Sequence, residues 1–179
     1  MYLRKLELKD APFMLEWMHD GNVIGNLRTD FASKTIQDAE GFIEWSSNDK
    51  KNLNLAIASD EDEYMGTVSL KHIDNESAEF AITVRQKAMG KGYAKYGMEE
   101  IMKIAADDYG IKYVYWCVNP DNRRAIRFYE KNNFKRIKWN HINIGGGVQQ
   151  RANSKLLLVY VSAINLKMNI GLPRPFAYM

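Results

Sequence analysis

An α+β fold with a mixed, mostly antiparallel sheet is predicted for this chain by three observations. Residues 53–58 alternate large apolar side chains with small or polar ones, which is the period-two pattern of a strand. Two more strand-like segments, Tyr64–His72 and Glu79–Arg85, follow after short turns, as in an antiparallel meander. A helical pattern then leads to the strand Lys112–Val118, and such a crossover joins parallel neighbours.

The amino-terminal region is predicted to hold one strand and two helices. The strand is Tyr2–Leu8, and Asp10 then caps a helix that runs to Met18. Gly21–Ala32 has no regular period and is expected to be irregular. Thr35 begins a capping box and a second helix. The apolar face of this second helix comprises Ile36, Ala39, Phe42 and Ile43.

The carboxyl-terminal half is predicted to alternate helices and strands. A long helix opens at Gly90–Gly92, and a shorter helix spans Asn122–Asn132. Two strands, Phe134–Trp139 and Leu156–Ser162, complete the sheet. The buried face of the long helix comprises Ala94, Met98, Ile101 and Ala105.

Composition and charge indicate one globular domain without a polyanionic partner. Hydrophobic residues form 46% of the 179 residues, which excludes a disordered chain. The 25 basic and 22 acidic residues leave a net charge of +3, which does not favour nucleic acid. One cysteine allows neither a disulfide framework nor a cysteine-based zinc cluster, and no segment resembles a membrane span or a secretory signal. We expect a cytoplasmic domain over residues 1–163. The tail over residues 164–179 is expected to dock on it or on a second subunit of a homodimer.

The stretch Arg85–Ala94, read as RQKAMGKGYA, combines two glycines with the start of the long helix. Glycine lets backbone N–H groups approach a ligand closely, and a helix amino terminus carries unpaired donors and partial positive charge. Lys87 and Lys91 add full charges. The pattern favours a phosphate site, and the alternative is a simple connecting turn. A Rossmann fingerprint does not fit because residue 95 is lysine, and no Walker A pattern is present.

The second informative stretch is Asn119–Phe134. Asn122 stands where it can cap the helix, and Asn133 stands where a left-handed carboxyl-terminal cap is expected. Phe128 and Tyr129 share one helical face with Ala125. Taken alone, this is an ordinary short helix with a core tyrosine.

Together, the two stretches resemble the GNAT superfamily of acetyl-CoA-dependent N-acetyltransferases. Gly-Lys-Gly-Tyr-Ala opens a helix, and Asn-x-x-Ala-x-x-Phe-Tyr-Glu-Lys-x-x-Phe follows the next strand, over residues 78–135. The subgroup most resembled is that of the ribosomal-protein N-terminal acetyltransferases and their small-molecule relatives. The resemblance implies a sheet with a splayed central parallel pair, flanked by helices.

The resemblance also implies acetyl-CoA as the acyl-donor cosubstrate, without a metal, in the opening between the parallel strands. Lys87 departs from the family pattern, which has glutamine or arginine there, and Asn133 stands where glycine is usual. The residues that the resemblance implies in cofactor binding are Val84, Lys87, Met89, Gly90, Lys91, Gly92, Tyr93, Ala94 and Asn122.

Tyr129 and Glu79 are the residues implied in catalysis. Tyr129 matches the general acid of the family, since a phenol with a pKa near 10 can protonate a leaving thiolate. Glu79 begins the strand that faces the thioester and is a candidate general base for the attacking amine. Its alternative role is a solvated carboxylate. His72 and His19 are weaker candidates that could line the acceptor pocket, and His141 is weaker still.

The reaction predicted is acetylation of a primary amine. A small molecule is favoured as acceptor, for example an amino-sugar, a polyamine or an antibiotic. A protein amino terminus and a non-catalytic CoA-binding module remain alternatives, although an intact Tyr129 argues against the latter. Gly145–Gly147 is a candidate acceptor-gating loop. Trp17, Trp45 and Cys117 are expected to be core residues.

Overall fold

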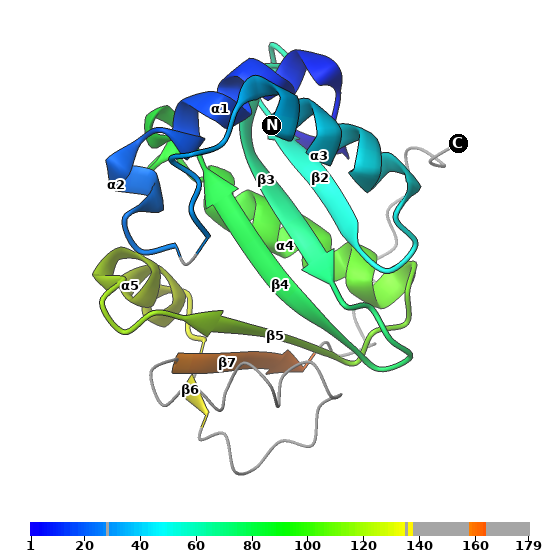
Figure 1. Cartoon of the computed structure of the whole chain (residues 1–179). Coiled ribbons are helices and arrows are strands. Elements are labelled where there is room, and N and C mark those ends of the chain that lie inside the picture. The colour runs from blue at the N-terminus through cyan, green and yellow to red at the C-terminus, as the bar shows by residue number, and fades with distance from the viewer. Residues whose placement is uncertain (28, 135, 138–157, 164–179) are drawn as a thin grey trace.

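The computed structural model describes residues 1–27, 29–134, 136–137 and 158–163, and these form a seven-stranded sheet between helices (Figure 1). The strand order is β1-β2-β3-β4-β5-β7-β6. Neighbouring strands are antiparallel except β4 and β5, which are parallel as predicted. The strands are β1 (Tyr2–Lys5), β2 (Leu53–Ala58), β3 (Tyr64–Lys71), β4 (Ser77–Val84), β5 (Tyr113–Val118), β6 (Arg136–Ile137) and β7 (Leu158–Ala163).

Helices cover both faces of this sheet, so the fold has three layers. In Figure 1, α1 and α3 lie over one face of strands β2–β4 and α4 lies over the other. Each face buries its own apolar cluster, one around Met14 and Ile43 and one around Ile101 and Trp116. The helices are α1 (Ala11–Met18), α2 (Gly21–Ile24), α3 (Ile36–Asn48), α4 (Tyr93–Asp107) and α5 (Arg123–Lys131), with 3₁₀ turns η1 (Leu8–Asp10) and η2 (Gln86–Ala88).

The central parallel pair splays apart, which confirms the predicted fold class. Strands β4 and β5 pair only where Ser77–Glu79 faces Tyr113–Tyr115. Beyond Glu79 the two strands separate, although β4 continues to Val84 and β5 to Val118. A V-shaped opening therefore lies at the carboxyl ends of both strands.

A close helix–sheet contact fixes α4 against the sheet next to this opening. A β carbon at Gly97 would lie 2.5 Å from Ile57 Cδ1 on β2, so any other residue at this position would require the Ile57 side chain to move. Met98, Ile101 and Ala105 are buried as predicted. The amino terminus of α4 consequently lies close to the end of β4.

Two predictions for the amino-terminal region were wrong. Strand β1 ends at Lys5 instead of Leu8, because the chain turns into η1, where the Asp10 carboxylate accepts hydrogen bonds from Arg4 at 2.7 and 2.8 Å. The segment Gly21–Ala32 is not wholly irregular, since it contains α2. The Asp20 carboxylate starts α2 by accepting a hydrogen bond from the Asn22 N–H at 2.9 Å.

The capping box at Thr35 is confirmed, because its hydroxyl accepts from the Asp38 N–H and the Asp38 carboxylate accepts from the Thr35 N–H.

Several earlier predictions fall outside the described residues, namely His141, the Gly145–Gly147 loop, the tail and parts of the two last strands. Within the described part of the chain, none of the helices has the length and apolarity needed to span a membrane.

Candidate active site

A cavity of about 180 Å³ lies where β4 and β5 separate. Its walls come from the end of β4, the turn before α4, the first two turns of α5, and the segment around α2. Six residues of the predicted cofactor and catalytic set line it: Val84, Met89, Gly90, Ala94, Asn122 and Tyr129. Six lining residues were missed, namely Val23, Leu27, Ile82, Thr83, Ala125 and Phe128. Arg124 also lines the cavity; the sequence left it open between a contact to the nucleotide end of CoA and a solvated helix face.

The two glycines of the turn adopt a left-handed backbone conformation. Gly90 has a φ of +74° and Gly92 a φ of +90°, which other residues adopt only with strain. A β carbon at either position would meet nothing within 4 Å, so the surface outside both is open. The conformation of the turn, not crowding by the protein, requires these glycines.

The start of α4 presents backbone donors toward this open surface. Its first helical hydrogen bond runs from the Tyr96 N–H to the Gly92 carbonyl at 2.9 Å. The N–H groups of residues 93–95 therefore lack an acceptor within the helix. Together with the partial positive charge of a helix amino terminus, these donors fit the phosphate group that the sequence predicts.

Among the described residues that line the cavity, the cation is Arg124, not Lys87. Lys87 lies on η2, and its ammonium group pairs with the Glu63 carboxylate at 2.8 and 2.9 Å. The Arg124 guanidinium donates to the Met89 sulfur at 2.8 Å, from the first turn of α5. Of the other predicted residues of the turn, Lys91, Gly92 and Tyr93 do not line the cavity.

Asn122 serves as the cap of α5 and also lines the cavity. Its side-chain oxygen accepts a hydrogen bond from the Ala125 N–H at 3.1 Å. The amide nitrogen of the same side chain is a separate donor. The capping role and a ligand-binding role are therefore compatible.

Tyr129 lies in an aromatic cluster at the base of the cavity. Its ring centroid is 5.2 Å from those of Trp116, Tyr160 and Phe128, and its side chain is only 6% exposed. Burial raises the pKa of the Tyr129 hydroxyl above its ordinary value. The hydroxyl therefore keeps its proton at neutral pH, and the raised pKa makes it a weaker acid than an exposed phenol.

Glu79 lies on the other face of β4. Side chains alternate along a strand, so Glu79, Ala81 and Thr83 face the α1–α3 layer, whereas Phe80 and Ile82 face α4. Glu79 Oε2 lies 3.6 Å from His72 Nε2, and the Glu79 side chain is 11% exposed. The structure thus brings together two of the acid–base candidates, although neither lines the cavity that contains Tyr129.

His19 does not join this pair. Its Nε2 atom lies 2.8 Å from the Lys34 carbonyl oxygen, in the connection between α2 and α3. Among the described residues, no group of three or more histidine, cysteine, aspartate or glutamate side chains is arranged to hold a metal ion.

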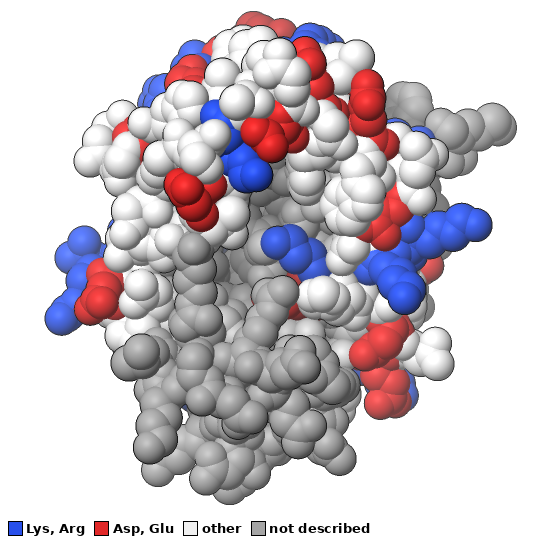
Figure 2. Space-filling view, in the orientation of Figure 1, with Lys and Arg blue, Asp and Glu red and all other residues white. Residues whose placement is uncertain are grey.

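A second cavity, of about 140 Å³, lies on the α1–α3 side of β4, where Ala81 and Thr83 line it and Glu79 does not. It is bounded by α1, α3 and the central strands, and it shares Ile82 and Thr83 with the first cavity. The splayed end of β4 therefore separates two cavities that meet at these two residues. Figure 2 shows acidic and basic side chains on the helical layer above a recess in this view of the molecule.

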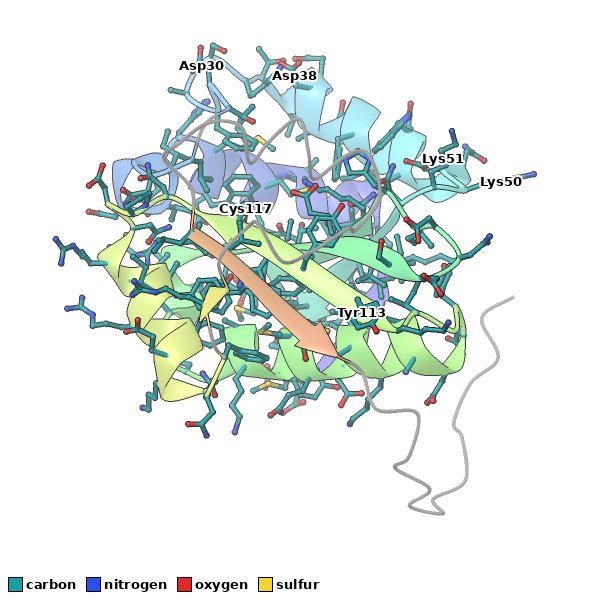
Figure 3. The ribbon with its side chains drawn as sticks, turned by 90° about the horizontal axis from the view of Figure 1, so that it is seen from below. Asp30, Asp38, Lys50, Lys51, Tyr113 and Cys117 are labelled. Carbon is teal, nitrogen blue, oxygen red and sulfur yellow. The ribbon has the colours of Figure 1, made fainter. Side chains whose placement is uncertain are left out.

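The three residues expected in the core differ in their environment. Trp17 is buried, its Nε1–H donates to the Tyr64 hydroxyl at 3.1 Å, and its side chain also lines the second cavity. Trp45 is 53% exposed, so the prediction that it is a core residue was wrong. Cys117 is half-buried on β5. Figure 3 shows it and Tyr113 at opposite ends of this strand.

Comparison with known proteins identifies the family. A family model described as an acetyltransferase (GNAT) domain matches residues 1–135, so this chain belongs to the GNAT acetyltransferase family and is an acyltransferase. An uncharacterized N-acetyltransferase, p20, from Bacillus licheniformis is 24% identical over 141 residues, covering 75% of this chain and 78% of that protein.

Solved structures share the fold. The spermidine N-acetyltransferase from Vibrio cholerae, in complex with CoA and spermine, superposes with a TM-score of 0.74 at 18% identity, covering 94% of this chain and 98% of that one. The microcin C7 self-immunity acetyltransferase, in complex with acetyl-CoA and AMP, gives a TM-score of 0.71 at 21% identity, covering 90% and 91%. The resemblance to the ribosomal-protein subgroup stays a prediction.

Proposed function

We propose that this protein transfers the acetyl group of acetyl-CoA to the primary amine of a small molecule. The observation that carries the proposal is the pair of cavities that meet at Ile82 and Thr83 on the splayed end of β4. One cavity combines the helix amino terminus with Tyr129, as a CoA thioester requires. The other is a partly open space of about 140 Å³, the size of a small acceptor. The ligands named for the two structural neighbours support the choice of cosubstrate.

Cofactor binding is assigned to the turn between β4 and α4 and to the start of α5. The N–H groups at the start of α4 bind the pyrophosphate, and glycine at 90 and 92 keeps the backbone accessible. Arg124 supplies a positive charge at the cavity. We assign the Asn122 amide nitrogen, which lines the cavity, as a donor to the pantetheine arm.

In the proposed reaction, the neutral amine nitrogen attacks the thioester carbonyl carbon, a nitrogen–carbon bond forms and the carbon–sulfur bond breaks. Glu79, paired with His72, takes the proton that the amine loses. Backbone N–H groups along the splayed part of β4 stabilise the negative charge that develops on the carbonyl oxygen. The Tyr129 hydroxyl protonates the leaving sulfur.

A screen of amines tests the proposal. Purified protein is incubated with acetyl-CoA and a panel of amino-sugars, polyamines, arylalkylamines and short peptides with free amino termini. Thiol release and the mass of the product are then measured. We expect at least one small amine to give both signals. Acetylation of peptides alone would replace the proposal by a protein amino-terminal acetyltransferase, and acetylation of nothing would refute it.

A further inference from the structure

The second cavity has an apolar roof and a polar floor without negative charge. The floor comes from strands β2–β4 and carries amide and hydroxyl groups. Among the described residues that line the cavity, Lys71 is the one with a charge, and none is a carboxylate. The roof comprises Met14, Trp17, Met18, Phe31 and Phe42, and the floor includes Asn54, Thr67, Ser69 and Thr83.

The size of the cavity limits what it can enclose. Its volume is about 140 Å³. A dry apolar cavity of about 150 Å³ in another protein takes up benzene. The second cavity therefore matches one ring-sized group. An aromatic body would also find edge and face contacts with Trp17 and Phe31, whose rings lie 5.0 Å apart in a T-shaped arrangement.

Asn54 supplies the polar anchor on the floor of the cavity. Its side chain is 7% exposed, and its Oδ1 atom accepts a hydrogen bond from the Ser69 hydroxyl at 2.7 Å. Its amide nitrogen is buried without a hydrogen-bond partner. A buried unpaired donor is costly, and a ligand oxygen that accepts from it removes that cost.

The same lining disfavours a polyamine. After one amine is presented to the thioester, a polyamine must still place at least one further ammonium group along the acceptor site. Burying an unpaired charge is strongly unfavourable, and the described lining offers Lys71 in place of a carboxylate.

We infer that the acceptor is an amine on a single ring-sized apolar body that presents one oxygen to Asn54, and not a polyamine. Tyramine has this chemistry, with an amine at one end of a ring and a hydroxyl at the other. The inference rests on the proposed function, because it takes the second cavity as the acceptor site. It departs from the spermidine named for the structural neighbour, whose likeness to this chain shows the fold alone.

The first experiment compares tyramine, 2-phenylethylamine and spermidine as substrates. We expect kcat/KM for tyramine to exceed that for 2-phenylethylamine about 10-fold, the scale of one hydrogen bond to a buried group, and that for spermidine about 100-fold or more. Spermidine used as well as tyramine would overturn the inference and leave the proposed function standing.

Calorimetry of the same amines with CoA-saturated protein separates the proposed function from the inferred preference of the second cavity for a ring-sized amine. If no amine is acetylated, the proposed function fails. Tighter binding of tyramine than of spermidine would then still support the character of the cavity. Equal binding of the two amines, tighter binding of spermidine, or no binding of tyramine at about millimolar concentration would overturn the inference about the acceptor.

A charge variant tests the cavity itself. Asn54→Asp places a carboxylate on the floor with nearly the same shape, so we expect the ratio of spermidine to tyramine kcat/KM to rise 10-fold or more. Asn48→Asp, at the exposed end of α3, makes the same charge change outside the cavity and should leave the ratio unchanged. An unchanged ratio in folded N54D protein would overturn the inference. The wild-type comparison decides the question if N54D does not fold.

Discussion

At the scale of single residues, Tyr129 has the clearest chemical role. Tyr129→Phe keeps the ring in its aromatic cluster but removes the proton donor. We expect turnover to fall about 100-fold or more, the usual scale for one acid–base group, with acetyl-CoA affinity nearly unchanged. Steady-state kinetics, calorimetry and thermal melting on one preparation measure all three quantities.

A matched control is available in the same cluster. Tyr160 stacks on Trp116, is fully buried and does not line the cavity. Tyr160→Phe makes the same atomic change and should lower the melting temperature without a comparable loss of turnover. If Tyr129→Phe behaves like this control, Tyr129 is a packing residue only and another group protonates the sulfur.

Glu79 leads to a prediction about pH. Between pH 7 and pH 9 the neutral fraction of an amine with a pKa near 10.4 rises about 100-fold, so a general base matters less at the higher pH. Glu79→Gln should therefore reduce turnover more at pH 7 than at pH 9. Glu76→Gln, at an exposed ion pair with Lys112, is the control and should be neutral at both values. An equal loss at both pH values would remove Glu79 from the base role.

At the scale of elements, the turn before α4 is predicted to bind the cosubstrate through its backbone. Gly92→Ala introduces a β carbon on the open surface where the phosphates are proposed to approach. Gly110→Ala adds the same β carbon at a comparable φ of +64°, also with nothing within 4 Å. Both should lose stability by a similar amount, but only Gly92→Ala should weaken acetyl-CoA binding, by 10-fold or more. Equal affinities in calorimetry would show that the turn does not approach the ligand.

The order and type of most elements could be predicted from the sequence because their signals are local. The alternation in β2, the capping box of α3 and the apolar face of α4 each depend on residues within a few positions of one another. Helix α2 was missed because four residues are too few for a period to show. It matters for the site, since Val23 lines the cavity.

The candidate site was only partly predictable, because charges pair over long distances in the sequence. Lys87 was read as a phosphate-binding cation, but Glu63, 24 positions away, pairs with it across the turn. No local sequence pattern predicts the ion pair between Lys87 and Glu63. For Arg124, in the first turn of α5, the sequence left two roles open, a contact to the nucleotide end of CoA and a solvated helix face, and the folded chain places it in the cavity lining. The second cavity depends on side chains of five elements, which only the folded chain brings together.

At the scale of the whole molecule, an ionic cluster ties the amino terminus to the sheet. Asp62, in the turn between β2 and β3, accepts hydrogen bonds from Lys9 at 2.5 Å, Tyr2 at 2.5 Å and Arg4 at 2.6 Å. These partners, with Lys9 the largest contribution, lower the pKa of the Asp62 carboxyl well below its usual value. A carboxyl whose pKa is lowered by folding stabilises the fold at pH values above its pKa in the unfolded chain, near 3.9. This contribution to stability is lost as the pH falls toward the pKa of the carboxyl in the folded state.

Asp62→Asn tests this cluster. The variant should melt below the wild type at pH 7, and the gap in melting temperature should shrink as the pH is lowered from about 5 to about 2. Glu44→Gln, on the exposed side of α3, serves as the control and should show no such pH-dependent gap. A gap of constant size across the range would mean that the Asp62 charge does not stabilise the fold.

The central claim is that the opening between β4 and β5 holds acetyl-CoA, and calorimetric titration of the purified protein tests it most directly. We predict one site per chain with micromolar affinity for acetyl-CoA and for CoA. The affinity should weaken as salt is added, because phosphates are recognised partly by charge. Absence of binding heat together with an unchanged melting temperature at about millimolar acetyl-CoA would contradict the claim.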